Sequence, residues 1–215
     1  LILSEICGAF YQKYPGIAVT LDIGNVGTPR ILFDKLDNKE IDILVTYASE
    51  NTNYLIEPIL EERLIIAIHR KMPGAKSLQP LALTRDEILT KAYAPDREIE
   101  DMSIFQGIEF LEFARKSDIS KRMAKLLGNY KTSRYKIENA RHSEIHYNLM
   151  QTGIGAVVTS TLGIAQKPYD EDILFFVPKS EESYRKIFFA YNFSAKDNPL
   201  IKNFIKVAKE IYASA

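Results

Sequence analysis

The sequence predicts an α/β protein, because two parts of the chain each alternate between helix-like and strand-like patterns. Apolar residues at helical spacing are followed by short apolar or β-branched runs, first over residues 1–47 and again over residues 108–160. Residues 73–107, between these parts, have a weaker pattern. A chain of 215 residues can bury the core of one large domain or of two smaller lobes.

The first series opens with a helix and a strand. LILSEICGAFYQKYPG has apolar residues close to helical spacing, and the pair Pro15 and Gly16 is expected to end the helix. IAVTLDI, residues 17–23, alternates apolar and polar side chains and is rich in β-branched residues. This pattern predicts a strand.

A second helix and strand follow. Thr28 is expected to be the N-cap and Pro29 the first residue of a helix. The apolar face of this helix is expected to contain Ile31, Leu32 and Leu36. IDILVTY, residues 41–47, is almost continuously apolar, which indicates a buried parallel strand.

The middle of the chain is less regular. Residues 55–69 predict two extended pieces that meet near Glu61 and Glu62. Thr84 is expected to cap a short helix that ends near residue 93, whereas residues 94–107 have no clear period.

The second series predicts several more strands with helices between them. Ser117 or Asp118 is expected to cap one helix, Gly128 to end it, and residues 142–152 to form the next. Strands are expected at residues 108–114, 134–139, 154–160, 173–178 and 186–192. The chain closes with the amphipathic helix pattern NPLIKNFIKVAKEIYAS.

The composition excludes several classes of partner. Lys plus Arg and Asp plus Glu both number 28, so the chain lacks the basic excess that favours nucleic acid. No apolar run approaches the ~20 residues that span a bilayer. Cys7 is the only cysteine, which excludes an internal disulfide and favours a reducing compartment. We therefore expect a cytoplasmic protein that binds neither membrane nor, through this chain, DNA.

The motifs of common enzymes are absent from the sequence. There is no G-x-S-x-G elbow, no Walker loop and no G-x-G-x-x-G after a strand, and Cys7 lies on the apolar stripe of its helix. His142 and His146 are four residues apart in RHSEIH, the spacing at which two imidazoles can share a zinc ion. However, Glu144 does not adjoin the first histidine as it does in H-E-x-x-H. We expect no catalytic residue, metal or cofactor.

Three stretches carry motifs whose order and spacing match a known family. The first, residues 10–47, has the motif residues Phe10, Tyr14, Pro15, Gly24, Leu36, Ile41 and Asp42, with Glu40 where Gly is more usual. The second, LMQTGIGAVVTS, matches at Gly153 and Gly155, with Thr159 where Pro is common. The third is NPLIKNFIK, with Asn198 in place of Ser. Together they resemble the effector-binding domain of LysR-type transcriptional regulators.

The resemblance implies a two-lobed fold of the periplasmic-binding-protein type II kind, in which each lobe is a mixed, mostly parallel sheet flanked by helices. Lobe I would contain residues 1–82 and 184–215, and lobe II residues 83–183. The family also has an N-terminal winged helix-turn-helix, which binds DNA, and a first strand, and neither is in this chain. The resemblance further implies a homodimer formed through this domain and a tetramer in the intact regulator. His146 stands where the family is commonly apolar, so packing is its simpler role.

Family resemblance and helix electrostatics together predict an effector site at turns between strands and helices. Helix N-termini offer free N–H groups and positive dipole, and two basic turns in lobe II favour an anionic effector such as a carboxylate. The candidate residues of lobe I are Asn25, Val26, Gly27, Thr28 and Tyr47. Those of lobe II are Lys116, Ser117, Asn139, Arg141, His142 and Ser143.

Other interpretations of these patterns stay open. Each candidate could be an ordinary helix cap, a turn residue or a solvated charge. The same fold also serves solute-binding proteins of transporters and some enzymes. The leading prediction is a sensor without enzymatic activity, and the alternative is a solute-binding protein.

Overall fold

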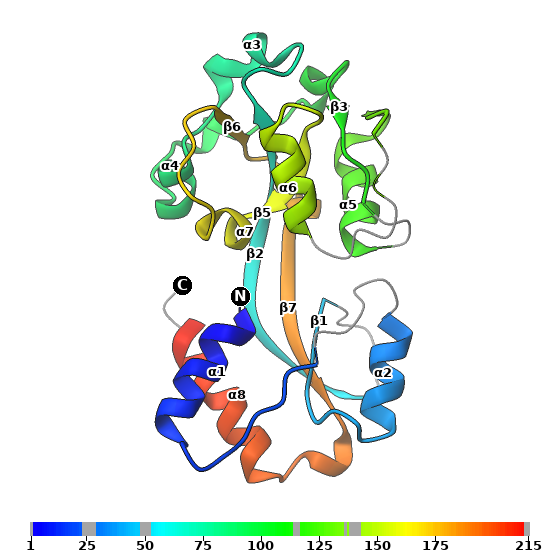
Figure 1. Ribbon diagram of the computed structural model, residues 1–215, viewed down its shortest axis with the longest axis vertical. Helices are drawn as coiled ribbons and strands as arrows, with labels where there is room; N and C mark the ends of the chain where they lie inside the picture. The colour runs from blue at the N-terminus through cyan, green and yellow to red at the C-terminus, as the bar shows by residue number, and fades with distance from the viewer. Residues whose placement is uncertain are drawn as a thin grey trace. The chain divides into compact units, whose positions relative to one another are not determined.

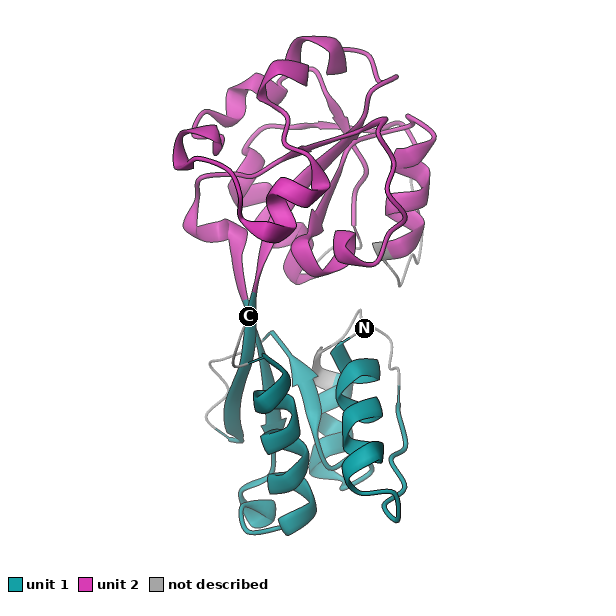
Figure 2. Cartoon of the chain, turned by 90° about the vertical axis from the view of Figure 1, so that its left-hand side faces the viewer, with its two compact units in different colours: residues 1–61, 186–215 teal, residues 62–185 magenta. Residues whose placement is uncertain are grey.

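The computed structural model describes residues 2–22, 29–47, 53–113, 117–135, 137 and 143–212. The chain forms two compact units: unit 1 is Leu1–Glu61 with Lys186–Ala215, and unit 2 is Glu62–Arg185 (Figure 2). Strands β2 (Leu55–His69) and β7 (Tyr184–Tyr191) each have residues in both units, so the chain passes between the units twice within strands.

The division between the units differs from the boundaries expected from sequence. Residues 62–82, which were expected in the first lobe, belong to unit 2, and the second boundary lies at 185/186 rather than 183/184. The reason is packing, because residues 64–68 of β2 are fully buried in the core of unit 2. Residues 55–69 form one continuous strand, and the unit boundary falls between Glu61 and Glu62, where two pieces were expected to meet.

Unit 1 is built from helices at both ends of the chain. Helix α1 (Ile2–Lys13) packs against α8 (Pro199–Tyr212), which lies beside it in Figure 1. Phe10 and Phe204 meet with ring centroids 5.2 Å apart, and Lys13 Nζ lies 3.0 Å from Glu210 Oε2. The 3₁₀ turn η5 (Phe193–Ala195) connects β7 to α8. The helices at both ends were predicted correctly from their periodicity.

The two strands expected before residue 48 are short or have no partner among the described residues. Strand β1 (Leu44–Thr46) pairs antiparallel with β7, with Val45 opposite Phe189, so its described partner is not parallel. Residues 17–22 pair with no strand among the described residues, although their composition predicts one. A β-branched segment becomes a strand only where another strand offers hydrogen bonds, and that depends on distant residues.

Helix α2 (Pro29–Asp37) begins at Pro29, as predicted, but its buried face differs. Phe33 and Leu36 are buried and Leu32 is half-buried, whereas Ile31 is 51% exposed. Phe33 stacks against Tyr54 at 4.8 Å between ring centroids, and Tyr54 donates a hydrogen bond to Asp37. The face of α2 that contains Phe33 is therefore the one that packs against the rest of unit 1, and Ile31 lies outside it.

Unit 2 is organised around β2. Strands β5 (Val157–Ser160) and β6 (Ile173–Phe176) both pair with β2 in antiparallel register. Parallel pairing occurs between β3 (Glu109–Phe110) and β4 (Lys131–Thr132) and at the bridge between Phe110 and Ala156. The expectation of mostly parallel sheets thus does not describe the ladders along β2, because β5 and β6 both run opposite to the long strand.

Two strands expected in unit 2, at residues 108–114 and 134–139, are shorter or lie elsewhere in the described part of the chain. Only Glu109 and Phe110 of residues 108–113 are in a strand. Residues 134, 135 and 137 are in none, and the strand near them is β4, a few residues earlier. β5, β6 and β7 lie where strands were expected.

Two helices of unit 2, α4 and α5, begin at caps that the sequence predicts. Thr84 and Glu87 form a reciprocal capping box at α4, Ser117 caps α5, and Gly128 ends α5 with φ 58°. The helices are α3 (Ala75–Leu78), α4 (Arg85–Thr90), α5 (Asp118–Leu127), α6 (Ser143–Gln151) and α7 (Thr161–Ala165). The 3₁₀ turns are η1 (Gln79–Leu81), η2 (Pro95–Arg97), η3 (Met102–Phe105) and η4 (Glu181–Ser183). None of the helices in the described parts of the chain is long and apolar enough to cross a membrane.

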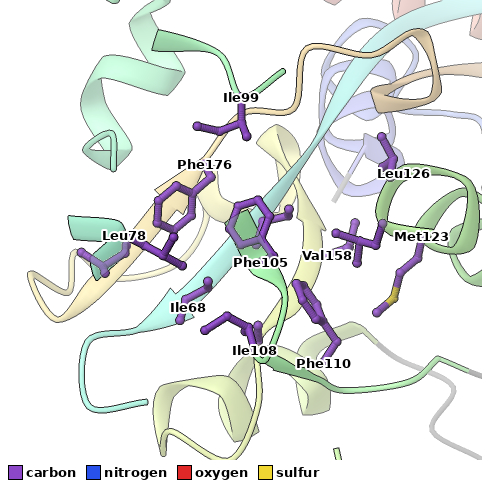
Figure 3. Packing of buried hydrophobic residues seen from close by; sticks show 14 of the residues in the cluster. Ile68, Leu78, Ile99, Phe105, Ile108, Phe110, Met123, Leu126, Val158 and Phe176 are labelled. Carbon is purple, nitrogen blue, oxygen red and sulfur yellow. The ribbon is translucent and has the colours of Figure 1, made fainter. Parts of the chain in front are cut away.

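Alternate side chains of β2 enter two separate hydrophobic clusters. Leu64, Ile66 and Ile68 belong to the cluster that contains Phe105, Phe110 and Phe176 (Figure 3). Ile65 and Ala67 belong to the cluster on the other side of the strand, with Leu111, Met150 and Phe175. Because successive side chains of a strand point to opposite faces, β2 is buried on both.

Truncation of Phe176 is expected to destabilise the protein strongly. The ring is fully buried and meets Phe105 edge-to-face at 5.3 Å between centroids. Phe176→Ala should lower the free energy of unfolding by about 3–5 kcal/mol, measured by urea denaturation followed by circular dichroism. Phe193→Ala is the control, since Phe193 is 55% exposed, and it should change stability by less than about 0.5 kcal/mol. Equal losses in both variants would contradict this assignment of the core.

Candidate functional site

The N-terminus of α5 is the best described part of the predicted site. Ser117 has extended backbone angles and its Oγ accepts a hydrogen bond from Ser120 N at 3.2 Å. Asp118 is the first residue of the helix, and its carboxylate pairs with Arg122 one turn later. Ser117 therefore acts as a helix cap, and the remaining N–H groups of the first turn have no partner within the helix.

The segments that lead to α5 and to α6 are held beside each other. β3 and β4 run parallel, so their carboxyl ends meet at one edge, and each is followed by one of the two turns predicted to bind the effector. His146, in the first turn of α6, lies 2.9 Å through Nε2 from the carbonyl oxygen of Glu112. Its ring stacks on Phe113 with centroids 4.1 Å apart. These contacts join Glu112 and Phe113, which precede the turn before α5, to His146 at the start of α6.

His146 thus has the packing role expected for it, since its side chain is fully buried. A carbonyl oxygen only accepts, so Nε2 carries a hydrogen. Nδ1 has no hydrogen-bond partner within the described residues. Glu144 points away from this contact and pairs with Lys167 at 3.2 Å.

Most of the predicted effector residues lie outside the described part of the chain. Tyr47 follows β1 directly and is 40% exposed, and Ser143 is the first residue of α6. The predicted residues that lie outside the description are Asn25, Val26, Gly27, Thr28, Lys116, Asn139, Arg141 and His142.

Two further chemical features of the described residues are their potential metal ligands and the single cysteine. In the ranges that the structure describes, no group of three or more His, Cys, Asp or Glu side chains could hold a metal ion. Burial raises the pKa of the partly buried Cys7 thiol, which disfavours the reactive thiolate.

Sequence reasoning missed a group of charged residues where β2 enters unit 2. Arg63 donates to both carboxylate oxygens of Glu98, at 2.5 and 2.7 Å, and to the carbonyl of Pro178 at 2.7 Å. Its guanidinium also lies 4.6 Å from the ring centre of Tyr184. The hydrogen bonds from Arg63 lower the pKa of the Glu98 carboxyl, although burial opposes the shift. The signal was EER between two apolar runs of one strand, because charges at such positions need partners when they are buried.

The fold is that of the regulatory domains of LysR-type transcriptional regulators. Among solved structures, the reduced regulatory domain of OxyR from Pseudomonas aeruginosa is 12% identical, with a TM-score of 0.71 over 97% of this chain and 91% of that chain. The CcmR regulatory domain of Synechocystis PCC6803, in complex with 2-PG, is 15% identical, with a TM-score of 0.72 over 97% of this chain and 90% of that one.

A third similar structure is CbnR, a LysR family transcriptional regulator, with 16% identity and a TM-score of 0.63. The match covers 97% of this chain but 64% of CbnR, so the chain spans less than two thirds of that regulator. No protein-family model and no curated protein matches the sequence. The likeness to these solved structures confirms the expected two-lobed α/β fold.

The pair of Arg63 and Glu98 should make stability depend on pH. Glu98 has a lower pKa in the folded state, so its contribution is present above the unfolded pKa, about 4.3, and is lost as pH falls through the folded value. Glu98→Gln should reduce stability by about 1–3 kcal/mol at pH 7, and this difference should shrink below pH 4 in urea titrations.

Glu100→Gln is the control for this measurement. Glu100 pairs with Lys179 at the surface, where an ion pair contributes about 0–1 kcal/mol. A difference between wild type and Glu98→Gln that does not vary with pH would contradict the electrostatic role of Glu98.

Removal of the Ser117 hydroxyl should weaken α5 selectively. Ser117→Ala leaves Ser120 N without its acceptor, so we expect a loss of about 1 kcal/mol, whereas Ser117→Asp should retain the cap. Hydrogen exchange of the α5 amides measures the effect. If exchange in α5 is the same in both variants, the cap does not stabilise the helix.

Proposed function

We propose that this chain is the ligand-sensing domain of a LysR-type transcriptional regulator and binds a small anionic effector between its two units. The observation that carries the proposal is the likeness in fold, over 97% of the chain, to regulatory domains that include one in complex with 2-PG. The connection of two units by two strands also suits a protein that responds to a ligand by rearrangement.

Unit 2 supports the anionic character of the effector. The first turn of α5 offers backbone N–H groups and the positive end of the helix dipole. The second basic turn precedes α6, and in the described residues His146 of α6 contacts the carbonyl oxygen of Glu112, which lies a few residues before α5 in the chain. Lys116 and Arg141 in these two turns would supply positive charge, and Arg141 could bind a carboxylate through two hydrogen bonds.

Unit 1 would complete the site from the turn after residue 23 and from the end of β1. Asn25, Val26, Gly27 and Thr28 precede α2, and Tyr47 follows β1. Backbone N–H groups of a glycine-containing turn can bind an anion without any basic side chain. The effector would then have contacts in both units.

A ligand changes an arrangement of units only if it binds one arrangement better than another. We propose that the effector does so and that the change reaches DNA through an N-terminal winged helix-turn-helix outside this sequence. The regulator would form homodimers through this domain, with α1 facing a partner, and tetramers when intact.

A thermal-shift screen tests the proposed function. Small organic acids, with 2-PG among them, should include at least one compound that raises the melting temperature. A ligand at 100 times its Kd adds about 2.7 kcal/mol of stability. If no acid stabilises the protein at millimolar concentration, the proposal of an anionic effector fails.

Arg141→Ala then tests the site with the compound that the screen selects. Loss of a charge-assisted hydrogen bond should weaken binding about 10- to 100-fold in calorimetric titration. Arg70→Ala is the matched control, because Arg70 is half-exposed and pairs with Asp172 at the surface. Equal affinity of Arg141→Ala and wild type would exclude Arg141 from the site.

A further inference from the structure

A buried ion pair joins the two strands that connect the units. Arg185, in β7, donates from Nε to Glu62 Oε1 at 2.7 Å and from Nη2 to the same oxygen. The side chain of Arg185 is 10% exposed and that of Glu62, in β2, is 2% exposed. Both groups lie within unit 2, of which they are the last and the first residue.

The pair extends to the start of α5. Arg185 Nη1 lies 3.6 Å from Asp118 Oδ2, and Asp118 directly follows the cap residue Ser117. Arg122, one turn later, lies 3.1 Å from the same carboxylate oxygen. Arg122 also donates to the carbonyl oxygens of Glu182 and Tyr184, at 3.2 and 2.9 Å, in the segment that leads into β7.

Stability alone is a poor explanation of this arrangement. Removing two charges from water costs about as much as their attraction returns, so apolar residues would hold two strands together equally well. What a guanidinium adds is geometry, because its planar fork fixes acceptors in different directions. Arg185 hydrogen-bonds Glu62 in β2 through Nε and Nη2, and its third nitrogen, Nη1, lies at ion-pair distance from Asp118 in α5, so the guanidinium relates the helix start to both strands.

We propose that Arg185 is a positioning residue, which ties the first turn of α5 to β2 and β7 at the two points where the chain enters and leaves unit 2. The inference deepens the proposed function and rests on it in one respect, that the first turn of α5 contacts the effector. Movement of that turn then changes the surroundings of Glu62 and Arg185, and movement of the strands changes the turn.

Hydrogen exchange of the ligand-free protein tests the link. Asp118→Asn keeps the size of the side chain and removes its charge. Amides of residues 62–64 and 185–187 should then exchange about tenfold faster, in addition to those at the start of α5. Lys125→Gln is the control in the same helix, because it breaks the ion pair with Glu182 without touching Arg185, and it should leave residues 62–64 unchanged.

A second variant separates positioning from general stabilisation. Arg185→Lys keeps a charge for Glu62 but lacks the fork that reaches Asp118, so it should speed exchange at the start of α5. At residues 62–64, Asp118→Asn should add little in that background, because both changes break the contact between Arg185 and Asp118, whereas loss of the pair between Asp118 and Arg122 affects α5 in either background. Effects at residues 62–64 that add fully, or an Asp118→Asn effect confined to α5, would overturn the proposal. If Arg185→Lys does not fold, the response of residues 62–64 to Asp118→Asn decides alone.

The two proposals can fail separately. The exchange measurement uses no ligand, so a negative result counts against the positioning role of Arg185 only. A thermal-shift screen without a stabilising acid counts against the proposed effector and leaves the exchange result unaffected.

Discussion

The structure depends on the burial of both faces of β2. Five consecutive residues, 64–68, are fully buried and are divided by strand alternation between two hydrophobic clusters. β5 and β6 pair with this strand, and the helices of unit 2 cover the clusters. Because both faces of this strand are buried in apolar clusters, a charged side chain at residues 64–68 would lack water and a partner. Within unit 2, Glu62 and Arg63 of β2 accordingly stand where the strand enters the unit, and there they find partners.

Polar chemistry in unit 2 collects at the ends of elements. Ser117 and Asp118 stand at the start of α5, His146 joins the start of α6 to residues 112 and 113, and Arg185 stands at the entry to β7. Ends of helices have backbone groups without partners, so side chains that satisfy or orient them gather there. Under the proposed function, these ends would be the parts of unit 2 that contact the effector, and the apolar interior would hold them in place.

The sequence was most informative where structure is local. Thr84, Ser117 and Gly128 were predicted as caps or stops because a cap depends on residues within one helical turn. Residues 17–23 and 134–139 were predicted as strands on composition, but the described residues among them (17–22, 134, 135 and 137) are in none, because pairing depends on distant neighbours. The pair of Glu62 and Arg185 is separated by 123 positions, so no local pattern could reveal it. Of the predicted effector residues, Ser117 was recognisable as the start of a helix, whereas its relation to Asp118 and Arg185 required the structure.

The discontinuity of unit 1 has a consequence for the order of folding. Helix α1 packs on α8, and β1 pairs with β7, so both contacts join the two ends of the chain across the whole of unit 2. Unit 2 is a single continuous segment and can assemble its core as soon as it leaves the ribosome. Unit 1 must wait until α8 has been synthesised, and until then the apolar face of α1 has no partner in α8. During that interval Ile6 and Phe10 of α1, which are buried in the folded chain, lack the cover that α8 provides.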